Sequence, residues 1–370
     1  MSDPFLKRLE IGFRRLFIRG LRCLVQRQSL PLTGLEFNAS KFLFIRQDRI
    51  GDVLVSTPLF RALKSKYPGA ILDVVLSPHN HAALGQNPHI RRRWIYRKTP
   101  LGALRLIRWL RSERYDFAID LMDNPSATST AICLLAGARW NVGINKENAY
   151  SYDIVVPLLS RKEAHIVDRL GQLLIPFGID PAKEKLVIEY ETSEKSEVTV
   201  RDHWHRLGLE GKRVVGINIS AGGEVRFWGA ENFRRLLKFL ERDFPTMPVL
   251  ILHKPAHRHQ AMDVTKGVKN AVLSPETTFD EFAAFVRRLT LLITPDTSVV
   301  HLAAAFGLPA VVLYVQSDPN LRIWEPYRTA HRALVTPVDD LSTISPDSVY
   351  DSTISLLSEV GLSTGDLEPQ

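Results

Sequence analysis

Short apolar segments alternate with longer helical segments along most of this chain, and this alternation restricts the fold more than any other feature. Strands that alternate with helices of ten or more residues form parallel βαβ units, in which helices cover the faces of a parallel sheet. The sequence therefore predicts an α/β fold. In the first half, the expected strands are 41–46, 71–76, 116–121, 139–144 and 154–156, and the expected helices are 52–66, 103–114 and 164–177.

The second half of the chain repeats this alternation after a polar, charged segment between Pro181 and Ser196, where we place a domain boundary. Its expected strands are 214–219, 249–253, 291–294 and 310–315, and its expected helices are 231–242, 279–289 and 299–307.

The two halves predict two Rossmann-like, doubly wound domains, at 39–185 and 196–340, that face each other across a cleft. Sheets of this kind bind ligands beyond the carboxyl ends of their strands. Residues 1–38 are expected to form a basic amphipathic helix, and residues 341–370 a C-terminal helix and tail.

Charge is unevenly distributed along the 370 residues, whose net charge is +8. Residues 1–120 hold 22 Lys and Arg against 9 Asp and Glu, so the basic character belongs to the N-terminal third. Such a field attracts phosphates of a nucleic acid, an anionic membrane or a phosphorylated substrate. Basic residues interleaved with aromatic ones, as in single-strand-binding proteins, are sparse, which argues against a nucleic-acid partner.

The two cysteines, Cys23 and Cys133, lack the spacing of a metal site or a disulfide framework, so a reducing, cytosolic compartment is expected. No run of 18 apolar residues suggests a spanning helix. Apolar residues recur at helical spacing between Leu6 and Val25, with six Lys and Arg between them and Arg27 just beyond. This pattern predicts a helix in the interface of an anionic leaflet, and the alternative is a helix packed on the first domain.

Three loops that follow predicted strands hold most of the candidate site residues. The first contains Arg46, Arg49, Gly51 and Asp52. Gly51 permits a tight turn, and Asp52 then stands at the start of a helix with its carboxylate over the sheet edge. A helix N-cap is the alternative role for Asp52, worth about 1 kcal/mol.

The second loop, 220–228, includes Ala221, Gly222 and Arg226. Small residues leave backbone N–H groups free to face an anion, and Arg226 can bind phosphate. An ordinary strand-to-helix connection with a solvated arginine is the alternative. The fingerprint Gly-x-Gly-x-x-Gly of NAD-binding domains is absent.

The third loop, 294–301, opens a helix whose N-terminal N–H groups favour a diphosphate. Thr297 and Ser298 can add hydrogen bonds, and Asp296 either contacts a sugar hydroxyl or caps the helix. His301 either faces the phosphates or is a buried core histidine. Thr277 lies in a further loop, at 275–278, to which we assign donor selectivity.

Together, these loops resemble glycosyltransferase family 9, the heptosyltransferases that extend the inner core of lipopolysaccharide. The resemblance rests on RIGDVLVSTPLFRALK at 49–64, on RFWGAENF at 226–233, and on Asp296-Thr297 with His301-Leu302-Ala303-Ala304-Ala305. It spans residues 41–340 in the family's order.

The resemblance implies a GT-B fold, with acceptor bound by the first domain and nucleotide sugar by the second. It also implies inverting, metal-independent transfer from ADP-L-glycero-β-D-manno-heptose, with no cofactor. Asp52 matches the family's catalytic carboxylate, and Arg226 matches its cationic diphosphate ligand. Asp296, Thr297 and His301 match its donor-binding loop, whereas Ser298 stands where the family usually has Gly.

We further assign Ala221, Gly222, Thr277 and Ser298 to donor binding, and Arg46, Arg49, Arg91, Arg92 and Arg93 to acceptor binding. The expected acceptor is a lipid-linked phosphorylated saccharide, which predicts a protein peripheral to the cytoplasmic face of a bacterial inner membrane. A catalytically idle relative, which binds a sugar nucleotide or acts as a scaffold, is the alternative function.

Overall fold

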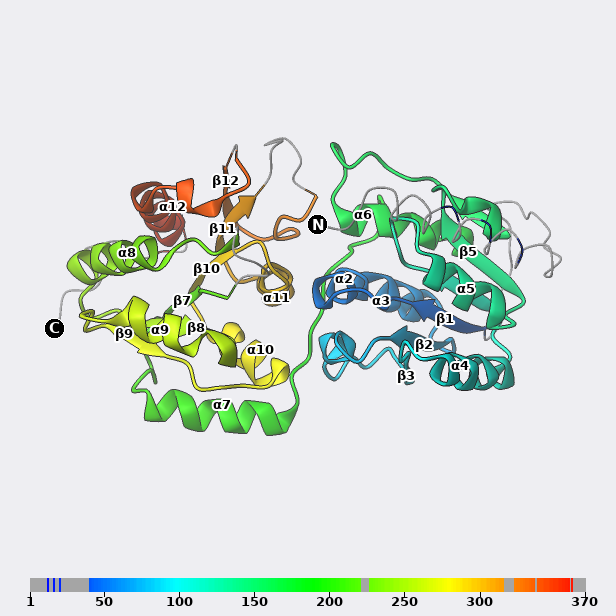
Figure 1. Ribbon diagram of the computed structural model, residues 1–370, viewed down its shortest axis with the longest axis horizontal. Coiled ribbons are helices and arrows are strands. Elements are labelled where there is room, and N and C mark those ends of the chain that lie inside the picture. The colour runs from blue at the N-terminus through cyan, green and yellow to red at the C-terminus, as the bar shows by residue number, and fades with distance from the viewer. Residues whose placement is uncertain are drawn as a thin grey trace. The chain divides into compact units, whose positions relative to one another are not determined.

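The structure is a computed structural model that describes residues 40–220, 226–315, 323–336, 338–359 and 361, together with Gly12, Leu16 and Gly20. The chain divides into two compact units, Met1–Leu186 (unit 1) and Val187–Gln370 (unit 2), shown in Figure 1. The division falls inside the charged segment 181–196. The helix expected at 1–38 lies outside the described residues, apart from those three positions. No helix in the described ranges combines the length and the apolar character needed to cross a bilayer.

Unit 1 is built on a six-stranded parallel sheet with the order β3-β2-β1-β4-β5-β6 in its described residues. All five strand pairs are parallel, as the alternation of strands and helices predicts. The strands are β1 Lys41–Ile45, β2 Ile71–Leu76, β3 Arg92–Ile95, β4 Phe117–Asp120, β5 Trp140–Ile144 and β6 Ile154–Val156.

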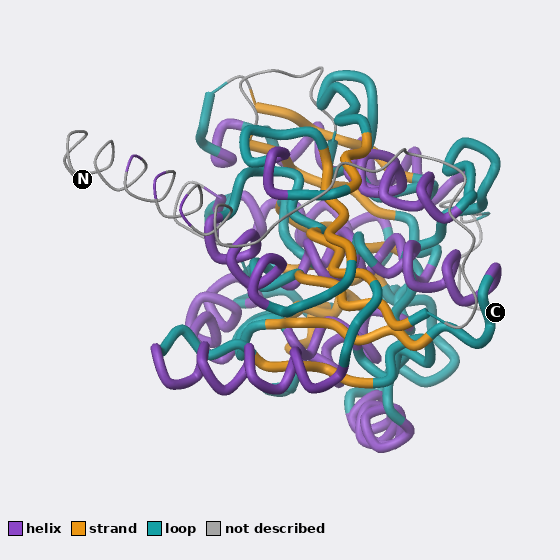
Figure 2. Tube along the Cα trace, turned by 90° about the vertical axis from the view of Figure 1, so that its right-hand side faces the viewer, coloured by secondary structure: helices purple, strands orange, loops and turns teal. Residues whose placement is uncertain are grey.

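Helices cover both faces of this sheet (Figures 1 and 2). They are α2 Ile50–Leu54, α3 Thr57–Lys66, α4 Pro100–Glu113, α5 Ala127–Leu135 and α6 Ile166–Gly171, with the 3₁₀ helices η1 His81–Leu84, η2 Ala149–Ser151 and η3 Gln172–Phe177.

Alternate residues of β1 face opposite sides of the sheet, and this determines the packing of the helices. Phe42 contacts Phe177 of η3, with ring centroids 5.2 Å apart, and Phe44 contacts Phe60 of α3 at 4.8 Å. On the other side, α4 and α5 contribute to a second buried cluster. Its members include Leu43, Ile45, Leu106, Leu110 and Ile132.

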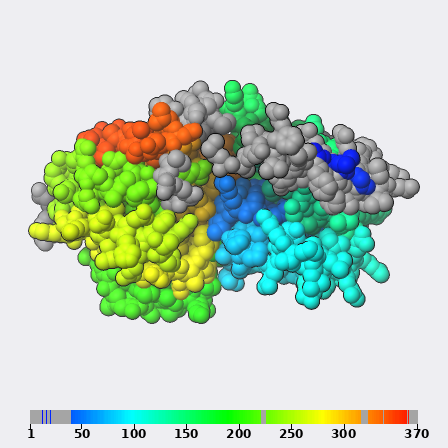
Figure 3. Space-filling model, viewed as in Figure 1, coloured from blue at the N-terminus to red at the C-terminus, as the bar shows by residue number. Residues whose placement is uncertain are grey.

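Unit 2 repeats the design with a parallel sheet of order β12-β11-β10-β7-β8-β9 across its described residues. The strands are β7 Val215–Asn218, β8 Val249–Leu252, β9 Ala271–Leu273, β10 Leu291–Pro295, β11 Ala310–Val315 and β12 His331–Thr336. The helices are α7 Glu194–Arg206, α8 Ala230–Asp243, α9 Arg258–Thr265, α10 Phe279–Arg287, α11 Val299–Phe306 and α12 Pro346–Glu359, with η5 Pro255–His257 and η6 Leu341–Thr343. Helix α7 forms the lower surface of this unit, in green in Figure 3.

The last helix, α12, belongs to the core of unit 2, although the sequence sets 341–370 apart as a helix and tail. Its Val349, Leu356 and Leu357 join the buried cluster of this unit. The segment before α12 also supports the start of α8, because Trp228 Nε1 donates to the Ile344 carbonyl at 2.8 Å.

Some elements differ from the predicted ones. The helix expected at 52–66 is two helices, α2 and α3, because Pro58 starts a new helix. The helix expected at 164–177 changes at Gln172 to the 3₁₀ helix η3, which contains Pro176. Six further strands and α-helices were not predicted from the sequence: β3, α5, α7, α9, β9 and β12.

Both sheets place a topological switch point between two neighbouring central strands. In unit 1 the chain moves outward from β1 through β2 and β3, and then returns to β4 on the other side of β1. In unit 2, β7 and β10 have the same relation. Ligands of open parallel sheets bind beyond the carboxyl ends of the strands at such points.

Candidate functional site

The switch point of unit 1 contains Arg46, which follows β1 and has only 1% of its side chain exposed. Its Nη2 donates to Asp52 Oδ1 at 2.9 Å, and its Nε donates to the Asp52 carbonyl at 3.0 Å. Its Nη1 donates to the carbonyl of Leu121, directly after β4. The guanidinium thus joins the two strands of the switch point to the start of α2. The sequence assigned Arg46 to acceptor binding, whereas the structure buries its guanidinium and gives it protein partners.

Asp52 lies in the first turn of α2, and 16% of its side chain is exposed. The N-cap residue of α2 is Arg49, and no side chain caps the helix. Capping therefore does not explain Asp52. A carboxylate is favoured in the first turn of a helix, and the bond to Arg46 fixes its Oδ1. The structure places Asp52 at the carboxyl edge of the sheet, as a group that acts on a bound ligand requires.

Asp48 is a second carboxylate beside the same guanidinium, with its Oδ1 3.3 Å from Arg46 Nε. Burial, together with the nearby charge of Asp52, raises the pKa of Asp48 to about 6, although the attraction of Arg46 opposes this rise. Asp48 was not predicted as a site residue, and its only signal in the sequence is a carboxylate in the loop that follows β1.

We expect Asp48→Asn to stabilise the protein more at neutral pH than near pH 4.5. An unfolded Asp loses its proton near pH 4. In the folded protein the loss occurs near pH 6, so between these values the folded state holds more protons and becomes less stable as pH rises. Asn removes this dependence, so the melting temperature of the variant relative to wild type should rise by a few degrees from pH 4.5 to pH 7.5. An equal difference at both pH values would show that the pKa of Asp48 is ordinary.

Asp120, at the end of β4, anchors a buried polar network that the sequence reading missed. It accepts from Lys146 Nζ at 2.9 Å, and from the hydroxyls of Ser129 and Tyr152. Lys146, after β5, also donates to the Met122 carbonyl. Because each charge in this network has partners, the loops after β4 and β5 are held rigidly beside Arg46.

The other predicted acceptor ligands lie in two different places. Arg49 is exposed at the start of α2, at the same edge as Asp52. Arg91 instead pairs with the buried Asp73 and with Glu113 at 2.7 Å. Arg92 pairs with the same Glu113.

Glu113 also lies 3.7 Å from the ammonium group of Lys41, the first residue of β1. The pairs of Arg91 and Arg92 therefore lie toward the amino ends of the strands, opposite the edge of Asp52. Arg93 donates to the carbonyl of Gly85. The structure does not bring Arg91, Arg92 and Arg93 together with Asp52.

The switch point of unit 2 is fixed by Asn218, the last residue of β7. Its Nδ2 donates to Thr294 Oγ1 at 2.9 Å and lies 3.4 Å from Thr297 Oγ1. The same nitrogen lies 3.4 Å from the Ser220 carbonyl. One amide therefore connects the loop after β7 to the loop after β10, which includes the predicted donor ligand Thr297.

Arg226 and Asp296, two predicted donor ligands from different loops, lie together in unit 2. Arg226 Nη1 is 3.9 Å from Asp296 Oδ2 and 3.5 Å from the Asp296 carbonyl. Both side chains are partly exposed. Arg226 contacts Asp296 through Nη1, so the other N–H groups of the guanidinium can donate to an anion. Ala221 and Gly222, the other predicted ligands of the Arg226 loop, lie outside the described residues.

The remaining predicted donor ligands are less closely grouped. Ser298 occupies the N-cap position of α11 and makes no side-chain cap. His301 is 5% exposed, and its ring lies 5.9 Å from that of Trp324. The structure thus gives His301 a buried position beside Trp324. Thr277 is half-buried after β9, at the outer edge of the sheet.

Ser220 connects a further loop to the switch point. Its Oγ accepts from the backbone N–H of Lys254 at 2.8 Å and lies 3.1 Å from His257 Nδ1. Burial and the nearby Lys254 and His253 lower the pKa of His257. The neutral imidazole is therefore favoured at pH 7, beside Ser220 at the carboxyl edge of the sheet.

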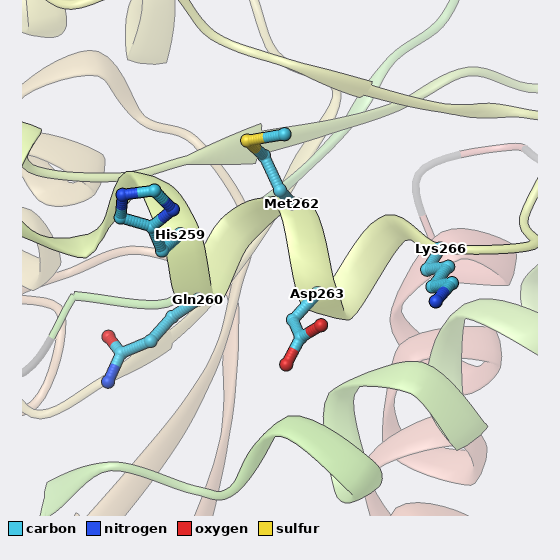
Figure 4. A pocket seen from close by; sticks show the side chains of 5 residues that line it. All are labelled: His259, Gln260, Met262, Asp263 and Lys266. Atoms are coloured by element: carbon cyan, nitrogen blue, oxygen red, sulfur yellow. The ribbon is translucent and has the colours of Figure 1, made fainter.

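Away from the switch points, the described residues form a shallow depression but no metal site. The depression lies on α9 and is lined by His259, Gln260, Met262, Asp263 and Lys266, and Figure 4 shows these side chains pointing in different directions. No group of three or more His, Cys, Asp or Glu is arranged to hold a metal ion within the ranges that the structure describes.

Comparison with known proteins identifies the family of this chain. The model of glycosyltransferase family 9 (heptosyltransferase) matches residues 103–343. The chain belongs to glycosyltransferase family 9. The matched range contains Arg226, Asp296 and His301, whereas the motif at 49–64 lies before it. The observed architecture is accordingly that of a family 9 glycosyltransferase.

Lipopolysaccharide heptosyltransferase 3 of Escherichia coli is 27% identical over 299 residues, which are 75% of this chain and 82% of that protein. A family 9 glycosyltransferase from Veillonella parvula has a TM-score of 0.78 at 20% identity, covering 88% of this chain and 100% of that one. The E. coli ADP-heptose lipopolysaccharide heptosyltransferase II has a TM-score of 0.70 at 22% identity, covering 87% and 100%. These structures share the GT-B fold with this family 9 chain, which confirms the predicted fold class.

Proposed function

We propose that this glycosyltransferase moves a heptose from ADP-heptose to a hydroxyl of a lipopolysaccharide core acceptor, with inversion at the anomeric carbon and without a metal ion or cofactor. The observation that carries the proposal is the Asp52 carboxylate, partly exposed at the switch point of unit 1 and held by the buried Arg46 at 2.9 Å. The names of the E. coli relatives support the choice of sugar and acceptor.

In the proposed reaction, Asp52 is the general base. The acceptor oxygen attacks the anomeric carbon as its proton passes to a carboxylate oxygen of Asp52. Because Arg46 holds Oδ1, we assign the proton to Oδ2. The rigid loop keeps this oxygen in place, which favours an aligned attack.

The leaving group is ADP, released when the bond between the anomeric carbon and the diphosphate oxygen breaks. Attack and departure on opposite sides of the carbon invert its configuration. The diphosphate gains negative charge as it leaves, and we assign its stabilisation to Arg226 and the N-terminal end of α11. We assign Asp296, which lies beside Arg226, to accept a hydrogen bond from a hydroxyl of the sugar.

The proposal is tested by incubating the protein with ADP-heptose and a heptose-deficient lipopolysaccharide acceptor. We expect the mass of the acceptor to increase by one heptose, and NMR of the product to show the inverted anomeric configuration. Retention of configuration would contradict the single-step mechanism. Hydrolysis of the donor without transfer would point to a different acceptor.

Nucleotide preference gives an independent test with the protein alone. A thermal-shift series with ADP, GDP, UDP and dTDP at equal concentration should give the largest stabilisation with ADP. A bound ligand raises stability by RT ln(1 + L/Kd), where L is the concentration of free ligand, so the tightest ligand raises it most. A larger shift with another nucleoside diphosphate would overturn the choice of donor but leave the transferase chemistry intact.

Replacing Arg226 with Ala should weaken donor binding by about 10- to 100-fold, since a hydrogen bond to a charged group contributes about 1.5–3 kcal/mol. The dissociation constant of ADP, measured by calorimetry, reports this change. Arg235→Ala is the matched control, because Arg235 is an exposed arginine of the same unit with its own acidic partner, Asp347, at 3.4 Å. Equal ADP affinity in the Arg226 variant and the control would remove Arg226 from the donor site.

A further inference from the structure

Helix α4 of unit 1 exposes several large apolar side chains on one face. Leu101 is 57% exposed, Leu104 68% and Trp109 52%. At 3.6 residues per turn, these three positions share one side of the helix with Arg105 and Arg108, which are also exposed. The opposite side holds Leu106 and Leu110, which are buried in the core. We call the set Leu101, Leu104, Arg105, Arg108 and Trp109 the outer face of α4.

The charged residues of the segment that contains this face, 91–112, are all basic. No Asp or Glu occurs between Arg91 and Ser112 in the sequence, and the exposed Arg97 and Lys98 precede the helix. Glu113, at the end of α4, is occupied by Arg91 and Arg92. Among the described residues, no carboxylate lies within ion-pair distance of Arg105 or Arg108. Their charges are therefore available to an anionic partner.

Other basic residues of this region are bound to the protein itself. Arg91 and Arg92 pair with Asp73 and Glu113. Arg111 Nε donates to the Leu135 carbonyl at 2.9 Å. The structure thus separates structural arginines from those that face solvent, a distinction that the sequence does not make.

The outer face is also rigid before any partner binds. Thr99 caps the helix by accepting from the Gly102 N–H at 3.1 Å, and Pro100 begins it. Trp109 stacks on Trp94, with ring centroids 6.0 Å apart, and Arg92 lies over Trp94 at 4.8 Å. Binding through a folded helix and a fixed indole costs little conformational entropy.

We propose that the outer face of α4 docks on an anionic lipid bilayer. Leucine and tryptophan side chains of an amphipathic helix enter the boundary between headgroups and acyl chains, while arginines contact anionic headgroups. Both kinds of side chain lie on this one face of α4, without an acid. The inference rests on the proposed function only for its biological setting, because a lipid-linked acceptor lies at such a surface.

The test is co-sedimentation of the full chain with vesicles of phosphatidylglycerol and phosphatidylcholine, and with phosphatidylcholine alone. Wild type should bind the anionic vesicles and be released by salt. Arg105→Gln with Arg108→Gln should weaken binding more than tenfold, since each basic residue near the surface contributes roughly fivefold. Leu101→Gln with Leu104→Gln should weaken it as well, through loss of apolar insertion.

Matched controls carry the same kinds of change on exposed positions of unit 2. They are Arg201→Gln with Lys238→Gln, and Val198→Gln with Met262→Gln. Vesicle binding of both control pairs should equal that of wild type. If both double variants of α4 bind the anionic vesicles as strongly as wild type, the proposal is overturned, and binding is assigned to another segment, such as the basic residues 1–38. Equal losses of vesicle binding in the α4 variants and the control variants would also overturn it, because they would show that the vesicles attract the protein through its overall charge and not through α4.

Activity separates this proposal from the proposed function. Leu101→Gln with Leu104→Gln should transfer sugar to a delipidated, water-soluble acceptor at the wild-type rate. Transfer by a protein that does not bind vesicles would refute the docking surface alone. Vesicle binding through α4 without any transfer would refute the proposed function alone.

Discussion

Replacing Asp52 with Asn should lower kcat by about 10²–10⁴-fold while the affinity for the nucleotide is largely kept. Asn has nearly the same shape, and its amide oxygen can still accept from Arg46 Nη2, so the loop should keep its structure. It cannot take a proton from the acceptor hydroxyl. The loss should therefore appear in kcat, measured at saturating donor and acceptor.

Two control measurements show whether the Asp52→Asn variant is folded and still binds the nucleotide. The Asp52→Asn variant should give a cooperative melting transition, at a temperature lower than that of wild type because the buried Arg46 loses one charged partner, and its ADP dissociation constant should be unchanged. Near-normal turnover in a folded variant would exclude Asp52 as the base. Asp48→Asn is a useful comparison, because Asp48 faces the same guanidinium and has no assigned role in proton transfer.

Replacing Arg46 with Met should both destabilise the protein and reduce its activity. Arg46 is buried, and its guanidinium donates to Asp52 and to the Leu121 carbonyl and forms an ion pair with Asp48. Removing one partner of a buried ion pair costs up to about 3–5 kcal/mol. Here the two carboxylates that lose their common cation are mostly buried, at 22% exposed for Asp48 and 16% for Asp52. Chemical denaturation should show this loss, and kcat should fall with it because Asp52 is no longer fixed.

Further variants show whether Arg46→Met lowers kcat by destabilising the fold or by releasing Asp52. Arg46→Lys keeps the charge and should retain more stability and activity than Arg46→Met. Adding Asp52→Asn to Arg46→Met should reduce kcat little further, because both changes act on one proton transfer. Fully additive losses in kcat would show that Arg46 does not act through Asp52. Arg49→Met, at an exposed position of the same loop, should change stability by less than about 0.5 kcal/mol.

Much of the fold follows from the period of apolar residues. Strands β1 and β11 are nearly continuous apolar runs because helices cover both faces of each sheet, and only the buried Asp73 interrupts such a run in β2. The bounds predicted for these three strands agree with the structure to within about one residue. Strand β3 was missed because Arg92 and Arg93 give this edge strand a polar sequence. Helix α7 was missed because its buried residues are few and its sequence is charged like a linker.

The candidate site was predictable only in part. That Asp52 and Asp296 follow strands could be read from the order of elements, because parallel strands all end at the same edge. Which arginines face a ligand could not, since Arg46 and Arg49 look alike in sequence. Whether an arginine can face a ligand depends on groups that are distant in the sequence. Arg46 donates to the carbonyl of Leu121, and Arg91 and Arg92 donate to the carboxylate of Glu113.

The support of Trp228 by the segment before α12 has a practical consequence for protein production. Trp228 is two residues from Arg226, and its indole bonds to the carbonyl of Ile344, while Asn232 bonds to that of Ser342 at 3.1 Å. A premature stop codon near residue 340 would thus remove the support of Trp228 and of the start of α8, although it would remove none of the residues to which we assign donor binding. Affinity tags are better appended after the final helix with a spacer, and shortened expression clones should retain that helix whole.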